Sequence, residues 1–287
     1  MAAYPRGRAL RTAKAMGRAF VVYAVLMILG VITAVPFIWM LISSLKEPGT
    51  LFLYPPRWIP DPVRLRNYVD LAQQMPFATF FLNSTKIALL STVGSLLACS
   101  LAAYAFARFN FVGKSFLFAV TISCLMVPYQ VELIPVFIIF YKLGLMDKHI
   151  VLWGPAFTGS AFGVFLLRQF FMTLPGELED AARIDGASRL GIYWRIFLPL
   201  SGPALTTLAI FTFMGSWNDL LGPVLYLSTE SKLTLTIGLA MMYHTWGATP
   251  WHLVMAGAVV SVLPILIVYI VGQKYFVQGI VMTGLKM

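Results

Sequence analysis

Long apolar runs, separated by short polar stretches, make up most of the chain. A helix crosses a bilayer with about 20 mostly apolar residues, and six runs reach that length. Within each run the apolar positions are continuous, whereas strands of a transmembrane barrel alternate between apolar and polar positions. We therefore predict an all-α transmembrane fold, a bundle of six spanning helices at residues 19–45, 80–106, 115–141, 150–171, 201–225 and 251–271.

The first run follows a basic segment, as the core of a secretory signal peptide does. Its apolar stretch is about twice as long as such a core, which has roughly 7 to 15 residues. We therefore expect an uncleaved span behind a short tail, residues 1–18, that carries Arg6, Arg8, Arg11, Lys14 and Arg18.

The third run is the least regular, because polar residues and prolines interrupt it at Pro128, Gln130, Glu132 and Pro135. Proline removes a backbone hydrogen bond and bends a helix, which a membrane protein tolerates where neighbouring groups satisfy the freed carbonyl. Two separate spans here would reverse the orientation of everything that follows. We expect a single broken span.

The composition fits a membrane protein and excludes several other classes. Of the 287 residues, 59% are hydrophobic and 11% are charged, against roughly 25% charged residues in an ordinary soluble domain. The net charge of +10 does not indicate nucleic-acid binding, since that function needs basic residues clustered on one face of a soluble domain. The two cysteines, Cys99 and Cys124, lie in apolar runs and are expected in the core.

The basic residues predict the orientation, because Lys and Arg of short loops and tails collect on the cytoplasmic side of a membrane. With the first tail inside, 13 of the 21 Lys and Arg residues fall on the inner side. Both termini are therefore expected in the cytoplasm. Lys86, at the outer edge of the second span, is expected to extend its ammonium group to the interface.

The inner segment between the fourth and fifth spans, residues 172–200, is longer and more patterned than a plain connector. A helix is predicted to begin near Gly176, because three acids suit its positive amino end: Glu177, Glu179 and Asp180. Glu179 and Arg183 form a favourable pair at i, i+4.

A second helix is predicted behind the first, since apolar residues recur at the spacing of one helical face at Leu190, Tyr193, Trp194, Phe197 and Leu198. Arg195 falls roughly opposite. We expect this helix to lie along the membrane surface until Pro199 turns the chain into the fifth span. Composition alone is equally consistent with an amphipathic connector that has no further task.

The order Asp180-Ala-Ala, then Gly186, then Ile196-Phe-Leu-Pro199 resembles the EAA loop of binding-protein-dependent ATP-binding-cassette importers. The string from Leu178 to Ser188 is similar to their carbohydrate branch, the maltose-transporter type of permease. One position departs from the pattern, because Asp180 stands where these permeases usually have glutamate. The side chain is one methylene shorter, and Glu179 beside it is a candidate to compensate.

The resemblance extends over most of the chain. Residues 55–60 with Asn67 and Tyr68 resemble the first outer loop of these permeases. Trp217-Asn-Asp219 resembles their fifth span, and Gly279 to Lys286 is similar to their glycine-rich tail, with a different ending.

The resemblance implies a permease subunit of a carbohydrate importer in the inner or plasma membrane of a prokaryote. The implied partners are a second homologous permease, two cytoplasmic ATP-binding subunits that carry ATP and Mg²⁺, an extracytoplasmic binding protein, and a sugar or oligosaccharide. The first loop helix would be the coupling helix, seated in a cleft of one ATPase. Its coupling residues would be Glu179, Asp180, Ala181, Ala182, Asp185, Gly186 and Ala187.

No catalytic, cofactor or metal site is expected in the chain itself. Gly113-Lys114-Ser115 imitates the end of a Walker A loop, but Arg108 occupies the position of its first glycine. The three histidines, His149, His244 and His252, have no metal-ligand spacing. ATP hydrolysis is therefore expected on the partner subunit.

Polar residues inside spans are costly in lipid and face the bundle interior or a water-filled path. The outer part of the fifth span offers the best path candidates, because an aromatic ring and polar groups suit a sugar: Trp217, Asn218 and Asp219. A second group lies at the break of the third span, at Tyr129, Gln130 and Glu132. Two structural alternatives stay open, namely that Asn218 and Asp219 hold the bundle together and that Glu132 stabilises the helix break.

Two other function classes are compatible with a membrane bundle. An ion-coupled carrier would use Asp219 or Glu132 as its ion site and would work without ATP, but it leaves the loop pattern unexplained. A membrane-embedded enzyme would need clustered catalytic groups at one depth, and three dispersed histidines do not supply them.

Overall fold

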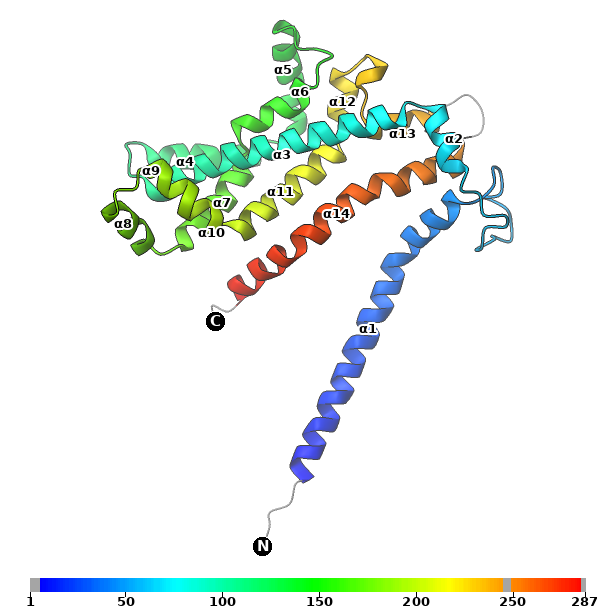
Figure 1. The fold of residues 1–287 in the computed structure, drawn as a ribbon, viewed down its shortest axis with the longest axis horizontal. Helices are drawn as coiled ribbons and strands as arrows, with labels where there is room; N and C mark the ends of the chain where they lie inside the picture. Colours follow the sequence, from blue (N-terminus) through cyan, green and yellow to red (C-terminus); the bar gives the residue numbers. More distant parts are fainter. Residues whose placement is uncertain (1–5, 245–248, 285–287) are drawn as a thin grey trace. The chain divides into compact units, whose positions relative to one another are not determined.

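The computed structural model describes the backbone of residues 6–244 and 249–284, and the side chains of residues 16–243 and 249–274. Every regular element in these ranges is helical, with no strand among them (Figure 1). The side chains of the basic tail up to Lys14, of His244 and of the segment from Gly279 to Lys286 lie outside the described residues.

The α-helices are α1 (Arg6–Ser44), α2 (Asn67–Gln74), α3 (Phe77–Arg108), α4 (Lys114–Ser123), α5 (Tyr129–Lys142), α6 (Ile150–Trp153), α7 (Ala161–Thr173), α8 (Glu177–Ile184), α9 (Arg189–Ile192), α10 (Leu198–Leu200), α11 (Gly202–Trp217), α12 (Leu221–Tyr226), α13 (Leu235–Met241) and α14 (Trp251–Gly284). Short turns of other helix types are η1 (Cys124–Met126), η2 (Gly154–Thr158), η4 (Glu230–Lys232) and η5 (Met242–His244), and η3 (Tyr193–Phe197) is a π turn.

Four helical segments are long and apolar enough to cross a membrane, namely Met16–Ser44, Phe77–Arg108, Ile150–Thr173 and Trp251–Lys274. Two bent pairs bring the number to six when each pair is one span, namely Lys114–Met126 with Tyr129–Lys142 and Arg189–Leu200 with Gly202–Trp217. The helices thus overlap all six predicted segments, and the all-helical, multi-pass membrane fold is confirmed.

The third predicted span is broken where its prolines indicated. η1 ends at Met126, Val127 is extended with φ −83° and ψ 116°, and α5 begins directly after Pro128. Proline disfavours a helical conformation in the residue before it, which explains the extended Val127. The two halves meet at 102°, far more than the kink of a continuous helix.

The fifth predicted span, residues 201–225, is wrong in its second half, because the helix stops earlier. α11 ends at Trp217 and α12 starts only at Leu221. Between them, the Asp219 carboxylate accepts the backbone N–H of Gly222 at 3.1 Å. This local bond competes with the hydrogen bonds of a continuing helix. Because the residues on both sides are apolar, hydropathy alone predicted an uninterrupted span.

Contacts divide the chain into two compact units: the chain up to Leu71 with Thr249–Val260, and Ala72–Ala248 with Ser261 onward. In the second unit, α3 lies along α7 and α11 (Figure 1). Glycines permit this approach, since a Cβ at Gly94 would lie 2.4 Å from the Phe157 ring and one at Gly163 would lie 2.6 Å from Cys99 Sγ. Small residues bring membrane helices close in this way.

The expectation for the cysteines is half right. Cys99 is fully buried at the contact of α3 with the start of α7, where its sulfur accepts the backbone N–H of Ser160 at 3.2 Å. Cys124 is exposed on η1, the turn that ends the first half of the broken third span.

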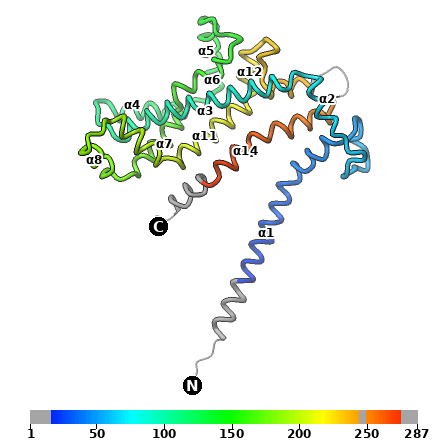
Figure 2. Tube along the Cα trace, viewed as in Figure 1, coloured from blue at the N-terminus to red at the C-terminus, as the bar shows by residue number. Residues whose placement is uncertain are grey.

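Helix α3 connects two ends of the second unit. The loop helices α8, α9 and α10 lie near its carboxyl end, and α12 and α13 lie toward its amino end (labelled in Figure 1; the same trace in Figure 2). At the amino end, Asn83 Nδ2 donates to the carbonyl oxygens of Ser231 (3.0 Å) and Leu233 (2.9 Å). One continuous helix of 32 residues therefore runs from the η4 segment to the loop helices.

In the first unit, Asn67 and Tyr68 fasten the end of α1 to α2. Asn67 is fully buried, and its amide donates to the carbonyl oxygens of Ser44 and Lys46, both at 2.8 Å. The hydroxyl groups of Ser44 and Tyr68 lie 2.8 Å apart. This pair thus stabilises the turn that follows the first span.

Candidate functional site

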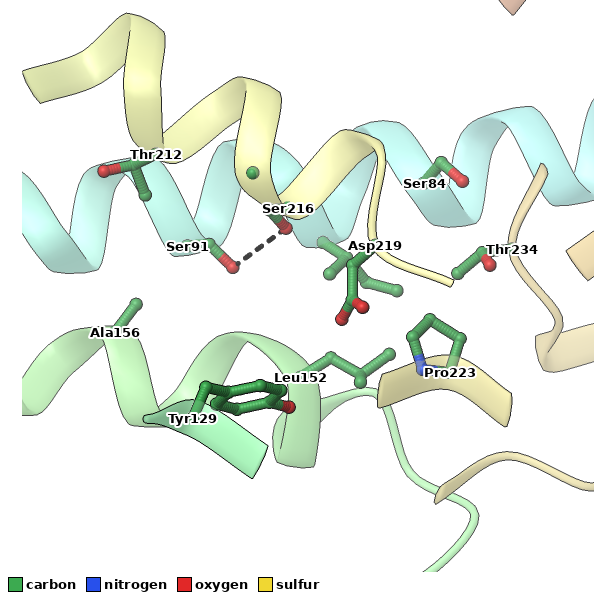
Figure 3. A pocket seen from close by; sticks show the side chains of 12 residues that line it. Ser84, Ser91, Tyr129, Leu152, Ala156, Thr212, Ser216, Asp219, Pro223 and Thr234 are labelled. Carbon is green, nitrogen blue, oxygen red and sulfur yellow. Dashed lines mark hydrogen bonds between the residues drawn. The ribbon is translucent and has the colours of Figure 1, made fainter. Parts of the chain in front are cut away.

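A polar cavity of about 380 Å³ lies within the second unit, bordered by α3, α11 and the residues around the helix breaks (Figure 3). Its volume is within the range of about 300–1,000 Å³ that small-molecule pockets occupy. The lining residues are Ser84, Ile87, Ser91, Tyr129, Leu152, Ala156, Thr212, Gly215, Ser216, Asp219, Pro223 and Thr234.

Hydroxyl groups of α3 and α11 line one side of the cavity. The Ser216 hydroxyl donates to Ser91 Oγ at 3.4 Å, and one turn away Thr212 donates to Ser95 Oγ at the same distance. Both contacts are long for bonds between hydroxyl groups, whose usual separation is about 2.7–2.8 Å. The hydroxyl groups that line the cavity, those of Ser91, Thr212 and Ser216, are therefore weakly engaged with their partners and available to the hydroxyl groups of a ligand.

Asp219 projects its carboxylate between α11 and Tyr129 (Figure 3). The Gly222 N–H holds one carboxylate oxygen, and the Thr236 hydroxyl donates to the Asp219 backbone carbonyl at 2.8 Å. Gly222 leaves the space that the carboxylate needs, because a Cβ there would lie 2.4 Å from Asp219 Oδ2 and 3.2 Å from the Leu152 side chain. Backbone and side chain thus fix this acid in one position.

The predicted path residues separate into two classes. Tyr129 and Asp219 line the cavity. Asn218, at the end of α11, is exposed and not among the lining residues. Gln130 and Glu132 are exposed on the first turn of α5, also outside the lining. The break of the third span therefore brings one of its three candidates to the cavity.

Trp217 packs in the core instead of facing the cavity. Its side chain is 3% exposed, its ring stacks on Phe213 at 5.8 Å between centroids, and Phe81 meets it edge-on at 5.4 Å. The indole N–H donates to the Ser261 carbonyl oxygen at 3.0 Å. An aromatic residue next to a polar pair suggested sugar binding, but rotation along α11 turns this ring toward α3 and α14.

Helix α8 confirms the predicted short helix in the loop. It begins at Glu177, one residue from the predicted start, with all three acids in its first turn. Glu179 is 6% exposed and accepts a hydrogen bond from the Arg183 guanidinium, as the i, i+4 spacing predicted. Glu179 therefore faces the protein, and it does not replace the shortened Asp180 on the outer surface.

Arg108, the last residue of α3, contacts both the end of α7 and helix α8. Its guanidinium donates to the carbonyl oxygens of Phe171 at 2.8 Å and of Leu174, which end α7, and lies 4.7 Å from the centre of the Phe197 ring. Its Nε lies 4.0 Å from Glu179 Oε2. Sequence reasoning used this residue only as an inner cation and as the departure from a Walker A loop, and no local signal could have found these contacts, because the partners lie more than sixty positions away.

The outer surface of α8 consists of the remaining coupling candidates. Asp180, Ala181, Asp185 and Gly186 are exposed, while Ala182 and Ala187 are partly buried against the core. Ile184 is 87% exposed. Ile184 is thus the most exposed apolar side chain of α8, beside the two exposed acids Asp180 and Asp185.

Gly186 ends α8 through its backbone conformation. Its φ is +78°, its N–H bonds to the Arg183 carbonyl at 3.0 Å, and the next N–H, of Ala187, bonds to the Ala182 carbonyl at 2.9 Å. This pattern is the Schellman motif, in which glycine is preferred because it takes a left-handed conformation without steric cost. No atom lies within 4 Å of a Cβ built there, so conformation and not space within the chain requires glycine.

In the second loop helix, only part of the predicted apolar face packs against the rest of the chain. Tyr193 and Phe197 are buried as expected, but Leu190 is 62% and Trp194 50% exposed, and Ile192 takes the buried position instead. The π turn η3 adds a residue to one turn, which rotates the later positions relative to the earlier ones. The bend into α11, at 78°, lies after Pro199 as predicted.

Between α5 and α6, the Asp147 carboxylate accepts hydrogen bonds from several donors of the η4 region. Its carboxylate accepts from Lys232 Nζ at 2.8 Å, from the Thr229 hydroxyl, and from the N–H groups of Ser228 and Thr229, both at 3.0 Å. The Lys232 ammonium, the Thr229 hydroxyl and these N–H groups hold the pKa of the Asp147 carboxyl well below its usual range.

His149 Nε2 lies 2.7 Å from the Lys232 carbonyl oxygen, so this histidine is a loop residue. No group of metal-ligating side chains occurs among the described residues.

The chain resembles known proteins over most of its length. Residues 91–282 match the family described as the binding-protein-dependent transport system inner membrane component. The chain is 36% identical over 228 residues to the arabinooligosaccharide transport system permease AraQ of Halalkalibacterium halodurans, covering 79% of this chain and 81% of that protein. It is 35% identical over 265 residues to the sn-glycerol-3-phosphate transport system permease UgpE of Yersinia pestis, covering 90% and 94%.

Solved structures share the fold. A chain of a bacterial ABC transporter involved in the import of the acidic polysaccharide alginate is similar with a TM-score of 0.80 and 24% identity, over 96% of this chain and all of that one. A chain of an alginate transporter in complex with its pentasaccharide-bound periplasmic protein is similar with a TM-score of 0.61 and 14% identity, over 90% and 94%. The chain therefore belongs to the family of inner-membrane permease components of binding-protein-dependent transport systems.

Proposed function

We propose that the chain is the permease subunit of an ATP-driven carbohydrate importer, in which it forms half of the translocation path and couples to a cytoplasmic ATPase through α8. The observation that carries the coupling role is the construction of α8 itself. Its buried Glu179 joins it to Arg183 and Arg108, while its outer surface presents small residues and the exposed Ile184. A helix held firmly on one side, with small and acidic residues and one apolar side chain exposed on the other, transmits the motion of a partner.

The proposed assembly follows the family. A second homologous permease completes the path, two ATP-binding subunits bind ATP and Mg²⁺, and an extracytoplasmic binding protein delivers the cargo. The distribution of Lys and Arg supports a cytoplasmic position of α8 and of both termini. The surface formed by Asp180, Ala181, Asp185, Gly186 and Ile184 is the proposed seat in the ATPase, and Glu179, Ala182 and Ala187 support it from the protein side.

The cargo class rests on the cavity and on the relatives. Hydroxyl groups of Ser91, Thr212 and Ser216, with the Tyr129 ring and the Asp219 carboxylate, offer the mixture of polar contacts and an aromatic face that a sugar uses. The relatives are named for arabinooligosaccharides, for sn-glycerol-3-phosphate and for an acidic polysaccharide. Family membership therefore supports carbohydrate-like cargo and leaves its charge open.

The coupling role is tested by substituting Ile184 in the full complex. We expect Ile184→Glu to lose the ATPase during co-purification from membranes, because a carboxylate would have to be buried in the partner's cleft. Ile59→Glu is the matched control, since Ile59 is 80% exposed on the loop after α1. Retention of the ATPase by the Ile184 variant would contradict the proposal. Uptake driven by an ion gradient without ATP would instead favour the ion-coupled carrier.

A further inference from the structure

We propose that the cavity admits neutral and cationic sugars and disfavours anionic ones, and that Asp219 is the residue that sets this selection. The inference deepens the proposed function, because it assigns a charge class to the cargo of the same site. It rests on three features of the described residues: the charges around the cavity, the fixed position of the carboxylate, and the surroundings in which it acts.

Asp219 is the one charged side chain among the residues that line the cavity in the described part of the chain. The polar remainder consists of hydroxyl groups, at Ser84, Ser91, Thr212, Ser216 and Thr234 with the Tyr129 phenol. Hydroxyl groups donate to or accept from a sugar of any charge. No described lining residue is an arginine or lysine, the side chains that pair with a carboxylate, phosphate or sulfonate on a ligand. The lining therefore discriminates charge through Asp219.

The carboxylate cannot turn out of the cavity without breaking contacts. Gly222 donates its N–H to Oδ1 at 3.1 Å, and a Cβ at Gly222 would lie 2.4 Å from Oδ2. The Leu152 side chain limits the space on the same side, because it would lie 3.2 Å from that Cβ. Figure 3 shows the carboxylate between the α11 hydroxyl groups and Tyr129. The negative charge is thus held at a defined place along the cavity wall.

A fixed charge acts strongly beside the protein wall of a cavity. The interaction of two charges grows as the effective dielectric constant falls, and it is several times stronger near protein than in bulk water. Rings of acidic side chains select cations in channels by the same effect. An anionic sugar that enters this cavity meets a like charge with no cation to offset it, whereas a neutral sugar gains a strong hydrogen-bond acceptor.

Charged thiol reagents measure this selection without knowledge of the cargo. Ser216→Cys places a thiol on the cavity wall one turn before Asp219, in a Cys124→Ser background that removes the exposed native cysteine. The full importer, in membrane vesicles, is treated with cationic trimethylammonium-ethyl methanethiosulfonate or with anionic sulfonatoethyl methanethiosulfonate. The measured quantity is the ratio of the two labelling rates. We expect Asp219→Asn, which keeps shape and acceptor, to lower this ratio at least tenfold.

Two further positions make the result decisive. Ser231→Cys, in the exposed η4 segment, should keep the same ratio with aspartate or asparagine at 219. Thr212→Cys, one turn farther along α11, provides a second cavity thiol if the first variant fails to fold, and it should show a smaller decrease. An unchanged ratio at both cavity positions would overturn the proposal, as would a failure of every reagent to reach a folded cavity thiol.

The experiment separates this inference from the proposed function. The labelling rates require neither ATP nor a known sugar, so charge selection can be refuted while ATP-driven uptake persists. Conversely, an importer that takes up no carbohydrate could still show the labelling ratio, and then only the cargo class would fail.

Discussion

The guanidinium Nε of Arg108 lies 4.0 Å from Oε2 of Glu179, so the last residue of α3 contacts the helix proposed to meet the ATPase. The Arg108 side chain also caps the carboxyl end of α7. Helix α3 contributes Ser84 and Ser91 to the cavity more than four turns away. A single rigid helix therefore connects the cavity with α8, and motion of α8 would be transmitted along it.

Replacing Arg108 with glutamine should weaken this connection. The variant leaves the carbonyl groups of Phe171 and Leu174 without their donor, which costs about 1–3 kcal/mol where buried groups lose a partner. We expect a lower thermal unfolding temperature for the purified complex and less uptake per ATP hydrolysed. Arg195→Gln, at an exposed position of η3, is the control. Equal unfolding temperatures of the two variants would show that Arg108 does not brace α8.

Gly186 should tolerate asparagine better than leucine, although the two side chains are similar in size. Asparagine adopts a left-handed conformation more readily than other residues with a side chain, whereas leucine pays about 1–2 kcal/mol for it. We expect α8 in the leucine variant to fray, visible as faster amide hydrogen exchange at Ala182 to Asp185. If both variants exchanged alike, the positive φ of Gly186 would not be what ends the helix.

Protonation of Asp147 should destabilise the contact between the α5–α6 connection and the η4 segment at low pH. Its pKa is depressed in the folded chain, so its contribution to stability is complete above the unfolded value of about 3.9 and is lost as the pH falls toward the folded pKa. We expect Asp147→Asn to unfold at a lower temperature than the wild type at pH 7. The difference should shrink below about pH 4, and a difference independent of pH would argue against ionic capping by Lys232.

Trp217 and Asp219 should respond differently to conservative substitution. Trp217→Phe loses the hydrogen bond to Ser261, at a cost of about 1 kcal/mol, but keeps the stacking on Phe213. Trp217→Ala removes the packing as well and should cost about 3–5 kcal/mol. Because the ring lies outside the cavity lining, Trp217→Phe should keep the charge preference of uptake while Asp219→Asn changes it. A changed preference in the Trp217 variant would return this ring to the path.

The positions of the spans were predictable from sequence, because crossing a bilayer depends on the length and polarity of each segment alone. The start of α8 and the Glu179–Arg183 pair were predictable for a similar reason, since capping acids and i, i+4 pairs act within a few residues. The break at Val127 and Pro128 followed from the local geometry of proline. In each case neighbouring residues along the chain suffice.

The tertiary structure decided what each side chain faces. Trp217 and Asp219 are two residues apart, yet packing against Phe213 and Phe81 buries the first while the Gly222 N–H holds the second in the cavity. In the loop helix with the π turn, Ile192 is buried where Leu190 was expected. Arg108 contacts residues more than sixty positions away in the chain. The sequence by itself thus determined which segments are long and apolar enough to span a membrane and which loop is patterned. A helix presents all its side chains outward, and the neighbouring helices determine which of its faces is buried and which lines the cavity. Contacts between segments distant in the chain therefore determined which polar groups meet.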